Sequence, residues 1–257
     1  MKFAYLFATV FVFAVTACSH ADARVNETEE GWISLPCDAA MKSWQEGVRE
    51  EWALAGEASL DTKDPTNLMT KPGQGVRVSQ RDAPKDSEHR NLTSVQLFGD
   101  LEVHVEFLVS KGSNAGVKLQ GLYEIQIRDT HDKEHPTASD CGGVYPRAEE
   151  FPIYHTIDKG FPPCTNAAKP AGEWQTLDLV FHAPRFDAEG RKTKHARFIK
   201  VVMNGQLIHE DVELKWPTGG AWRLKPEVAE GPLFLQGDHG PIAYRAVRVR
   251  PIKQDKK

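Results

Sequence analysis

Residues 101–109 read LEVHVEFLV, an alternation of apolar and polar residues that indicates β-structure. Apolar residues occupy positions 101, 103, 105, 107 and 109, while glutamate or histidine fills 102, 104 and 106. This period of two predicts a β-strand with one buried face and one solvated face. The same spacing predicts strands at 177–181, 197–203, 233–235 and 244–249. The dipeptide Asn204-Gly205 predicts a two-residue hairpin turn between the apolar runs on either side of it.

In the rest of the chain, short strand patterns dominate and the spacing typical of helices is nearly absent. The pattern allows one short helix, over 39–51. Many short strands separated by turns predict an all-β protein, a jelly-roll β-sandwich of two antiparallel sheets. No linker rich in proline, glycine or serine divides the chain, so we expect one sandwich domain at 31–252 and a solvated tail at 253–257.

The composition excludes several classes of protein. Of the 257 residues, 40% are hydrophobic, and 36 acidic against 32 basic residues leave a net charge of −4. The apolar fraction is too high for a disordered chain. The acidic balance also argues against a nucleic-acid partner, because phosphate binding requires clustered lysine and arginine.

The N-terminus carries the features of an export signal. Lys2 supplies a positive charge, and residues 3–17 are uncharged and mostly apolar. We expect residues 1–17 to be a signal peptide, Cys18 to be lipidated, and 18–30 to form a tether. The alternative is cleavage after Ala23, which would release a free secreted protein. The lipoprotein interpretation predicts a location in the periplasm or at the outer membrane, with membrane contact through the lipid anchor alone.

A long segment at 129–172 interrupts the strand spacing and contains two of the remaining cysteines. Because oxidised compartments favour disulfides, we expect a bridge between Cys141 and Cys164, with Cys37 left as a buried free thiol. The aromatic residues of this segment argue against disorder. We therefore expect an ordered, bridged loop over one sheet; the alternative is a structural insertion packed on the edge of the sandwich.

Two adjacent predicted strands place polar residues on a common face. Their apolar residues are at 115, 117, 119, 123, 125 and 127. The opposite face then presents Asn114, Lys118, Gln120, Glu124, Gln126 and Arg128. Carboxylate, amide and cationic groups beneath an aromatic loop are suited to a polyhydroxylated ligand, because hydroxyls need paired donors and acceptors. The alternative is an ordinary solvated outer face.

A second group of candidate residues lies near the C-terminus. The turn at 237–241 contains Asp238 and His239. In the strand that follows, unbroken alternation places Arg245 on the same side as the core positions Val247 and Val249. A cation in phase with core positions is more often paired and functional than a random surface charge.

The order of six motifs carries a family resemblance. They are Gly31-Trp32-Ile33-Ser34-Leu35, Ser113-Asn114-Ala115-Gly116-Val117, Tyr123-Glu124-Ile125-Gln126-Ile127, Gly172-Glu173-Trp174, Asn204-Gly205 with Ile208-His209, and Leu235-Gln236-Gly237-Asp238-His239-Gly240 with Tyr244-Arg245. In these motifs the chain resembles the 3-keto-disaccharide hydrolase family. The resemblance implies a concanavalin A-like jelly roll and hydrolysis of glycosides that carry a ketone at sugar carbon 3. Two features depart from the family: Gln120 stands where many members carry arginine, and residues 38–44 lack the usual Asp-Gly-Lys start.

The implied reaction assigns roles to the candidate residues. A ketone at C3 acidifies the hydrogen on C2, so a base can remove it, the C1 substituent can leave, and water can add. We expect Glu124 to be the base, with His239 as the alternative base or as the acid. Arg245, or a divalent cation (Ca²⁺, Mg²⁺ or Mn²⁺), would stabilise the enolate. The predicted substrate-binding residues are Asn114, Lys118, Gln120, Gln126, Asp129 and Asp238.

The reaction also implies a partner, since a sugar 3-dehydrogenase must make the ketone. A different class of function stays open, because the same fold serves as a non-catalytic carbohydrate-binding module. A serine or cysteine hydrolase is disfavoured, since the sequence contains no Gly-x-Ser-x-Gly motif and the cysteines are better explained by lipidation, a disulfide and a buried thiol.

Overall fold

The structure is a computed structural model that describes residues 31–45, 52–79 and 91–253. The predicted signal peptide, the lipidation site Cys18 and the tether lie outside these residues. Within the described ranges, no helix is long and apolar enough to cross a membrane.

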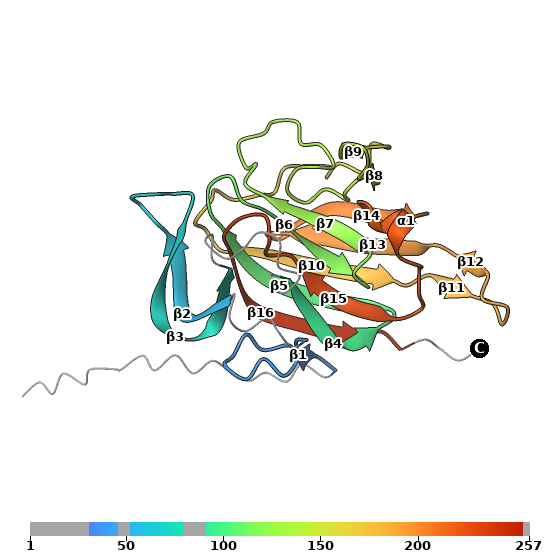
Figure 1. The fold of residues 1–257 in the computed structure, drawn as a ribbon, viewed down its shortest axis with the longest axis horizontal. Helices are drawn as coiled ribbons and strands as arrows, with labels where there is room; N and C mark the ends of the chain where they lie inside the picture. The colour runs from blue at the N-terminus through green and yellow to red at the C-terminus, as the bar shows by residue number, and fades with distance from the viewer. Residues whose placement is uncertain (1–30, 46–51, 80–90, 254–257) are drawn as a thin grey trace, which may run out of the picture.

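Two antiparallel sheets pack face to face, as predicted (Figure 1). The larger sheet has eight strands, in the order β14 (Gln206–Leu214), β13 (Ala196–Met203), β10 (Gln175–His182), β5 (Leu101–Val109), β16 (Ile242–Pro251), β3 (Leu68–Ser79) and β2 (Trp52–Leu60), with β1 (Ile33–Ser34) beside β16. The smaller sheet has four, in the order β4 (Leu92–Phe98), β15 (Gly231–Leu235), β6 (Asn114–Leu119) and β7 (Tyr123–Arg128). The all-β jelly-roll prediction is confirmed.

Short elements complete the fold at its periphery. They are the pairs β11 (Arg185–Phe186) with β12 (Lys192–Lys194) and β8 (Ala148–Glu149) with β9 (His155–Thr156), and the helix α1 (Ala221–Leu224). In Figure 1, β8, β9 and α1 lie on one side of the molecule, while the β2–β3 hairpin stands at the other end.

The alternation in β5 explains the core between the sheets. Val105 and Phe107 are fully buried, and so are Phe181 of β10 and Tyr123 of β7, whose ring centroids lie 5.5 Å apart. Burial of such side chains is the main favourable contribution to folding. The intervening residue Glu106 faces outward. The predicted hairpin is also present, with positive φ at both Asn204 (51°) and Gly205 (79°), as its tight turn requires.

The predicted helix over 39–51 is wrong in its described part. Residues 39–45 form bends and turns, and 46–51 lie outside the described residues. The carboxylate of Asp38 accepts hydrogen bonds from the amides of Ala40 and Met41 at 3.0 Å, and Met41 has a φ of 49°. An aspartate that bonds nearby amides stabilises a turn instead of a helix. Trp44 then forms a β-bridge with Ser94 of β4.

The predicted disulfide is also wrong, because Cys141 and Cys164 are free thiols in the structure. Cys141 is buried, with its sulfur 3.9 Å from the sulfur of Met203. Cys164 is exposed, and its thiol lies 3.2 Å from the carbonyl oxygen of Leu207. Cys37 is a buried free thiol, as predicted, and its burial raises its pKa to about 12.

The long segment at 129–172 is ordered and has features of both predicted arrangements. Val144 forms β-bridges with Ile125 of β7 and with Phe161, so the segment extends the edge of the smaller sheet. It also carries β8 and β9. Beyond this edge, Tyr145 and Tyr154 of the segment line a cavity on the outer face of the smaller sheet.

Candidate active site

A cavity of about 470 Å³ lies on the outer face of the smaller sheet. It is lined by Asn114, Lys118, Glu124, Gln126, Tyr145, Glu150, Tyr154, Gly219, Gly220, Gln236 and His239. Five of these residues were predicted from the sequence, namely Asn114, Lys118, Glu124, Gln126 and His239. The structure therefore brings together the polar face of β6 and β7 with the C-terminal turn.

The carboxylate of Glu124 occupies a tightly enclosed position in this cavity. Glu124 is directly opposite Lys118 in the β6–β7 register, and Lys118 Nζ lies 3.2 Å from its Oε2. The residue is only 5% exposed. A Cβ atom at Gly116 would overlap Oε1 of Glu124 and lie 2.9 Å from its Cδ. The carboxylate thus fills the space that the missing side chain of Gly116 leaves.

Two amides lie on the same face, next to the carboxylate. Nε2 of Gln126 donates a hydrogen bond to Oδ1 of Asn114 at 2.6 Å. This bond fixes the orientation of both amides, because each amide has distinct donor and acceptor ends. The sheet therefore presents ordered polar groups beside a buried carboxylate.

His239 is oriented by its neighbour in the turn. Its Nδ1 donates to Oδ1 of Asp238 at 2.6 Å, which leaves Nε2 as the nitrogen available to a ligand. This hydrogen bond raises the pKa of His239 against the opposing effect of burial. Burial acts to raise the pKa of Asp238, but the hydrogen bond and charge of His239, with the amides of Asn91 and Gln236, lower it to about 2. Both effects favour a charged imidazolium–carboxylate pair.

Six lining residues from loops were not among the predicted site residues, and two of them are the glycines 219 and 220. Tyr154 donates a hydroxyl hydrogen bond to Tyr145 at 2.9 Å. The carboxylate of Glu150 lies against Gly220, where a Cβ atom would overlap its Oε1. Gln236 lies within a quoted motif and contacts Nδ1 of His239 at 3.0 Å, so the sequence contained a signal for it. No periodicity marks Tyr145, Glu150 or Tyr154, which lie in the irregular segment.

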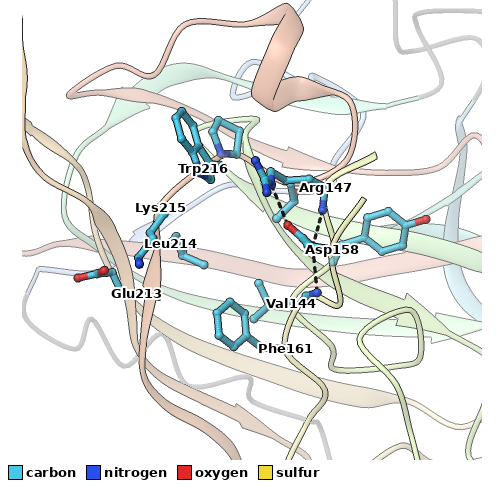
Figure 2. A pocket seen from close by; sticks show the side chains of 12 residues that line it. Val144, Arg147, Asp158, Phe161, Glu213, Leu214, Lys215 and Trp216 are labelled. Atoms are coloured by element: carbon cyan, nitrogen blue, oxygen red, sulfur yellow. Dashed lines mark hydrogen bonds and ion pairs between the residues drawn. The ribbon is translucent and has the colours of Figure 1, made fainter. Parts of the chain in front are cut away.

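An ion pair closes the base of the loop that carries Glu150 and Tyr154 (Figure 2). Arg147 donates to Asp158 through its main-chain amide at 3.1 Å and through Nε at 2.7 Å. Its guanidinium also lies 5.7 Å from the ring centroid of Trp216. These groups line a second cavity, of about 310 Å³, which shares Tyr145 with the first. The pair holds the two ends of the loop together beside the candidate site.

Arg245 does not reach the cavity, and the prediction that it shares a face with Val247 is wrong. The register of β16 shifts between Arg245 and Arg248, and Ala246 has a φ of 50°. This bulge inserts one residue, so Tyr244 and Val247 both point into the core while Arg245 points out of the sandwich. There Arg245 Nε lies 2.5 Å from Glu106 Oε2, and its guanidinium lies 3.9 Å from the ring centroid of Trp174.

Gln120 and Asp129 also lie away from the cavity lining. Gln120 has a φ of 57° in the β6–β7 turn, and its Nε2 donates to the carbonyl of Ala229 at 3.1 Å. Asp129 accepts a hydrogen bond from the amide of Gly112 at 2.9 Å. Both side chains stabilise loops, and their predicted substrate contacts are not supported by their placement. Asp238 acts on the cavity indirectly, through His239.

The side chains of the cavity do not fit the divalent cation that was considered as an alternative to Arg245. Among the described residues, no three His, Cys, Asp or Glu side chains gather as a metal-binding group. The position beside Oε2 of Glu124 is taken by the ammonium of Lys118. A carboxylate paired with lysine is a poor starting point for a cation site, because the two cations would repel each other.

Comparisons with known proteins place the chain in a family. A family model described as the 3-keto-alpha-glucoside-1,2-lyase-like domain matches residues 31–250. A crystal structure from Parabacteroides distasonis ATCC 8503, provisionally named a glycosyl hydrolase, is 21% identical with a TM-score of 0.62, and the match covers 87% of this chain and 84% of that one. A second from the same organism, with the same provisional name, is 17% identical with a TM-score of 0.56, covering 87% and 100%.

At such identities these two structures show a common fold and nothing more. No curated protein matches the chain. The family model spans almost the entire described sandwich, and it confirms the resemblance carried by the six motifs. The chain belongs to the 3-keto-alpha-glucoside-1,2-lyase-like domain family.

Proposed function

We propose that this carbohydrate-active jelly-roll protein cleaves 3-keto glucosides by elimination across C1 and C2, followed by hydration. The observation that carries the proposal is the buried carboxylate of Glu124, held beside Lys118 in a cavity that also contains His239. This set provides a base, a cation and an acid around one ligand-sized space.

In the proposed mechanism, Glu124 removes the proton from C2, and the electron pair forms an enolate with the C3 oxygen. The carbonyl then re-forms, a double bond forms between C1 and C2, and the C1–O bond breaks. His239 in its imidazolium form donates a proton to the departing oxygen. Water adds at C1 and a proton returns to C2, so the products are a 3-keto sugar and an alcohol.

Lys118 takes the role that the sequence had assigned to Arg245. Its ammonium lines the cavity, lies next to the proposed base, and can bind the enolate oxygen as negative charge develops there. Asn114 and Gln126 would orient the sugar hydroxyls. The proposal includes export as a lipoprotein and a sugar 3-dehydrogenase that supplies the ketone.

Deuterium incorporation tests this function. The protein is incubated in D₂O with methyl 3-keto-α-D-glucoside and, separately, with unoxidised methyl α-D-glucoside. We expect cleavage of the ketone alone, with deuterium at C2 of the product above the level of an enzyme-free control. Cleavage of the unoxidised glucoside at a similar rate would contradict the proposal. Binding without cleavage of either compound would instead identify a carbohydrate-binding module.

The replacement Arg245→Ala is expected to leave turnover unchanged, whereas Lys118→Gln should lower kcat by about 10²-fold. The reason is placement, since Lys118 lines the cavity and Arg245 lies on the far face of the other sheet. The pair of Arg245 with Glu106 is partly buried on the outer face of the sheet, so its loss should lower stability modestly, by about 1 kcal/mol, and the variant should fold. Steady-state kinetics with a melting curve checks both variants. A large loss of kcat in Arg245→Ala alone would reverse the assignment.

The variant Asp238→Asn is expected to shift the pH dependence of turnover. The hydrogen bond to Asp238 raises the pKa of His239, so its loss should lower that pKa. Because the proposed acid works in its protonated form, the alkaline limb of the kcat profile should move to lower pH. Glu106→Gln, on the outer face of the other sheet, is the matched control and should leave the profile in place. An alkaline limb that stays fixed in Asp238→Asn would remove His239 from the role of acid.

A further inference from the structure

A third cavity, of about 290 Å³, adjoins the candidate active site between β8 and α1. It is lined by Ala148, Glu149, Glu150, Phe151, Gly220, Arg223 and Leu224. Its two large apolar side chains are unusually exposed, Phe151 by 83% and Leu224 by 63%. Clustered exposed apolar residues next to a polar cavity are typical of ligand-binding surfaces.

The third cavity and the active-site cavity are neighbours that share two lining residues. Glu150 and Gly220 line both. The Glu150 carboxylate lies against Gly220, with no room between them for a side chain on residue 220. A ligand that extends from one cavity into the other would therefore pass beside Glu150 and Gly220.

The two cavities differ in chemistry. The active-site cavity presents amides, a buried carboxylate and an ammonium group. In the third cavity, the guanidinium of Arg223 is already paired with Glu149 at 2.8 Å. Apart from the carboxylate of Glu150, which the two cavities share, this cavity offers a ligand mainly the exposed ring of Phe151 and the aliphatic side chain of Leu224. Sugar hydroxyls placed against this surface would lose hydrogen bonds to water without replacement.

We propose that the third cavity binds the group attached to C1 of the sugar, and that this group is apolar, an aromatic or alicyclic alcohol in glycosidic linkage. The proposal rests on the proposed function, because it places the 3-keto sugar in the active-site cavity. The substrate class then becomes 3-keto glucosides of apolar alcohols, in preference to disaccharides. The exposed surfaces of Phe151 and Leu224 become buried when such a substrate binds.

The experiment compares cyclohexyl and methyl 3-keto-α-D-glucoside, whose leaving groups are both simple alkoxides. We expect wild-type protein to have the higher kcat/KM for the cyclohexyl compound. In Phe151→Ser and in Leu224→Ser, the cyclohexyl-to-methyl ratio should fall about tenfold, since each variant removes apolar contact area. Phe151→Leu should restore much of the preference. Met69→Ser, at an exposed apolar residue in the distant β2–β3 hairpin, should leave the ratio unchanged.

The result also separates this proposal from the proposed function. Turnover of both compounds with a ratio that neither serine variant changes would overturn the apolar subsite and leave the function intact. If neither compound is turned over, the proposed function is wrong. The apolar subsite is then tested by calorimetry, which compares the affinities for unoxidised cyclohexyl and methyl α-D-glucoside. Tighter binding of the cyclohexyl compound that Leu224→Ser abolishes would support it, and equal affinities would overturn it.

Discussion

Glu124→Gln is expected to lower kcat/KM for a 3-keto glucoside by about 10²- to 10⁴-fold, the usual contribution of a general base. The amide has the shape of the carboxylate and can still accept a hydrogen bond from Lys118, but it cannot take a proton from C2. Because Glu124 is only 5% exposed, water has little access to this position and cannot readily act as the base in its place. Kinetics on the 3-keto glucoside and exchange of the C2 hydrogen in D₂O measure the loss.

The same variant needs two controls. Glu106→Gln changes an outer-face carboxylate of the other sheet and should retain full activity. The melting curve of Glu124→Gln itself should be close to that of the wild type, since the replacement preserves the volume of the side chain. His239→Ala should also lose activity. Near wild-type turnover in both Glu124→Gln and His239→Ala would show that the chemistry takes place elsewhere.

Gly116→Ala should lower kcat/KM by about 10²-fold through a single added methyl group. The new Cβ would overlap Oε1 of Glu124 and lie 2.9 Å from Cδ and 3.0 Å from Cγ, so the end of that side chain must move. A displacement of about 1 Å in a catalytic group costs on this order. Gly116 is not among the glycines with positive φ, so alanine is compatible with the β6 backbone. We therefore expect lost activity with a nearly unchanged melting temperature.

A matched control is Gly99→Ala, in the turn between β4 and β5. Its added methyl would meet the carbonyl of Ala229 at 3.4 Å, an ordinary contact, and it lies away from the residues that line the cavity. This variant should keep both activity and stability. Full activity in Gly116→Ala would mean that the position of the Glu124 carboxylate does not limit turnover.

The sequence predicted the strands and half of the candidate site because alternation is reliable along an unbroken strand. β6 and β7 pair in continuous register from Asn114–Arg128 to Leu119–Tyr123. Their polar residues therefore share one face, as expected. The same logic held for β5, where every second side chain is buried.

The predictions of side-chain direction fail where the backbone leaves the extended region at a residue type that does not usually adopt a positive φ. Ala246 and Gln120 both have positive φ without being glycine, and each ends the alternation that was extrapolated through it. Because the alternation was continued through Ala246, Arg245 was assigned to the wrong face of the sheet. Because it was continued to Gln120, that residue was wrongly assigned to the site. Glu150 and Tyr154 were missed for another reason: irregular loops have no period, and tertiary contacts alone decide where their side chains lie.

Hydrogen bonds between β6 or β7 and the connecting segments that contain Thr218, Gln236 and His239 hold the polar side of the active-site cavity. The main-chain N–H of Asn114 donates to the carbonyl of His239 at 3.2 Å, and the main-chain N–H of Gln236 donates to the carbonyl of Gly116 at 2.9 Å. The main-chain N–H of Glu124 donates to the hydroxyl of Thr218 at 3.1 Å. Main-chain amides held in such hydrogen bonds exchange with solvent deuterium only when those bonds open. The sugar ring would therefore meet polar side chains whose main-chain positions are already fixed by hydrogen bonds, so little of the free energy of binding would be spent on ordering that face.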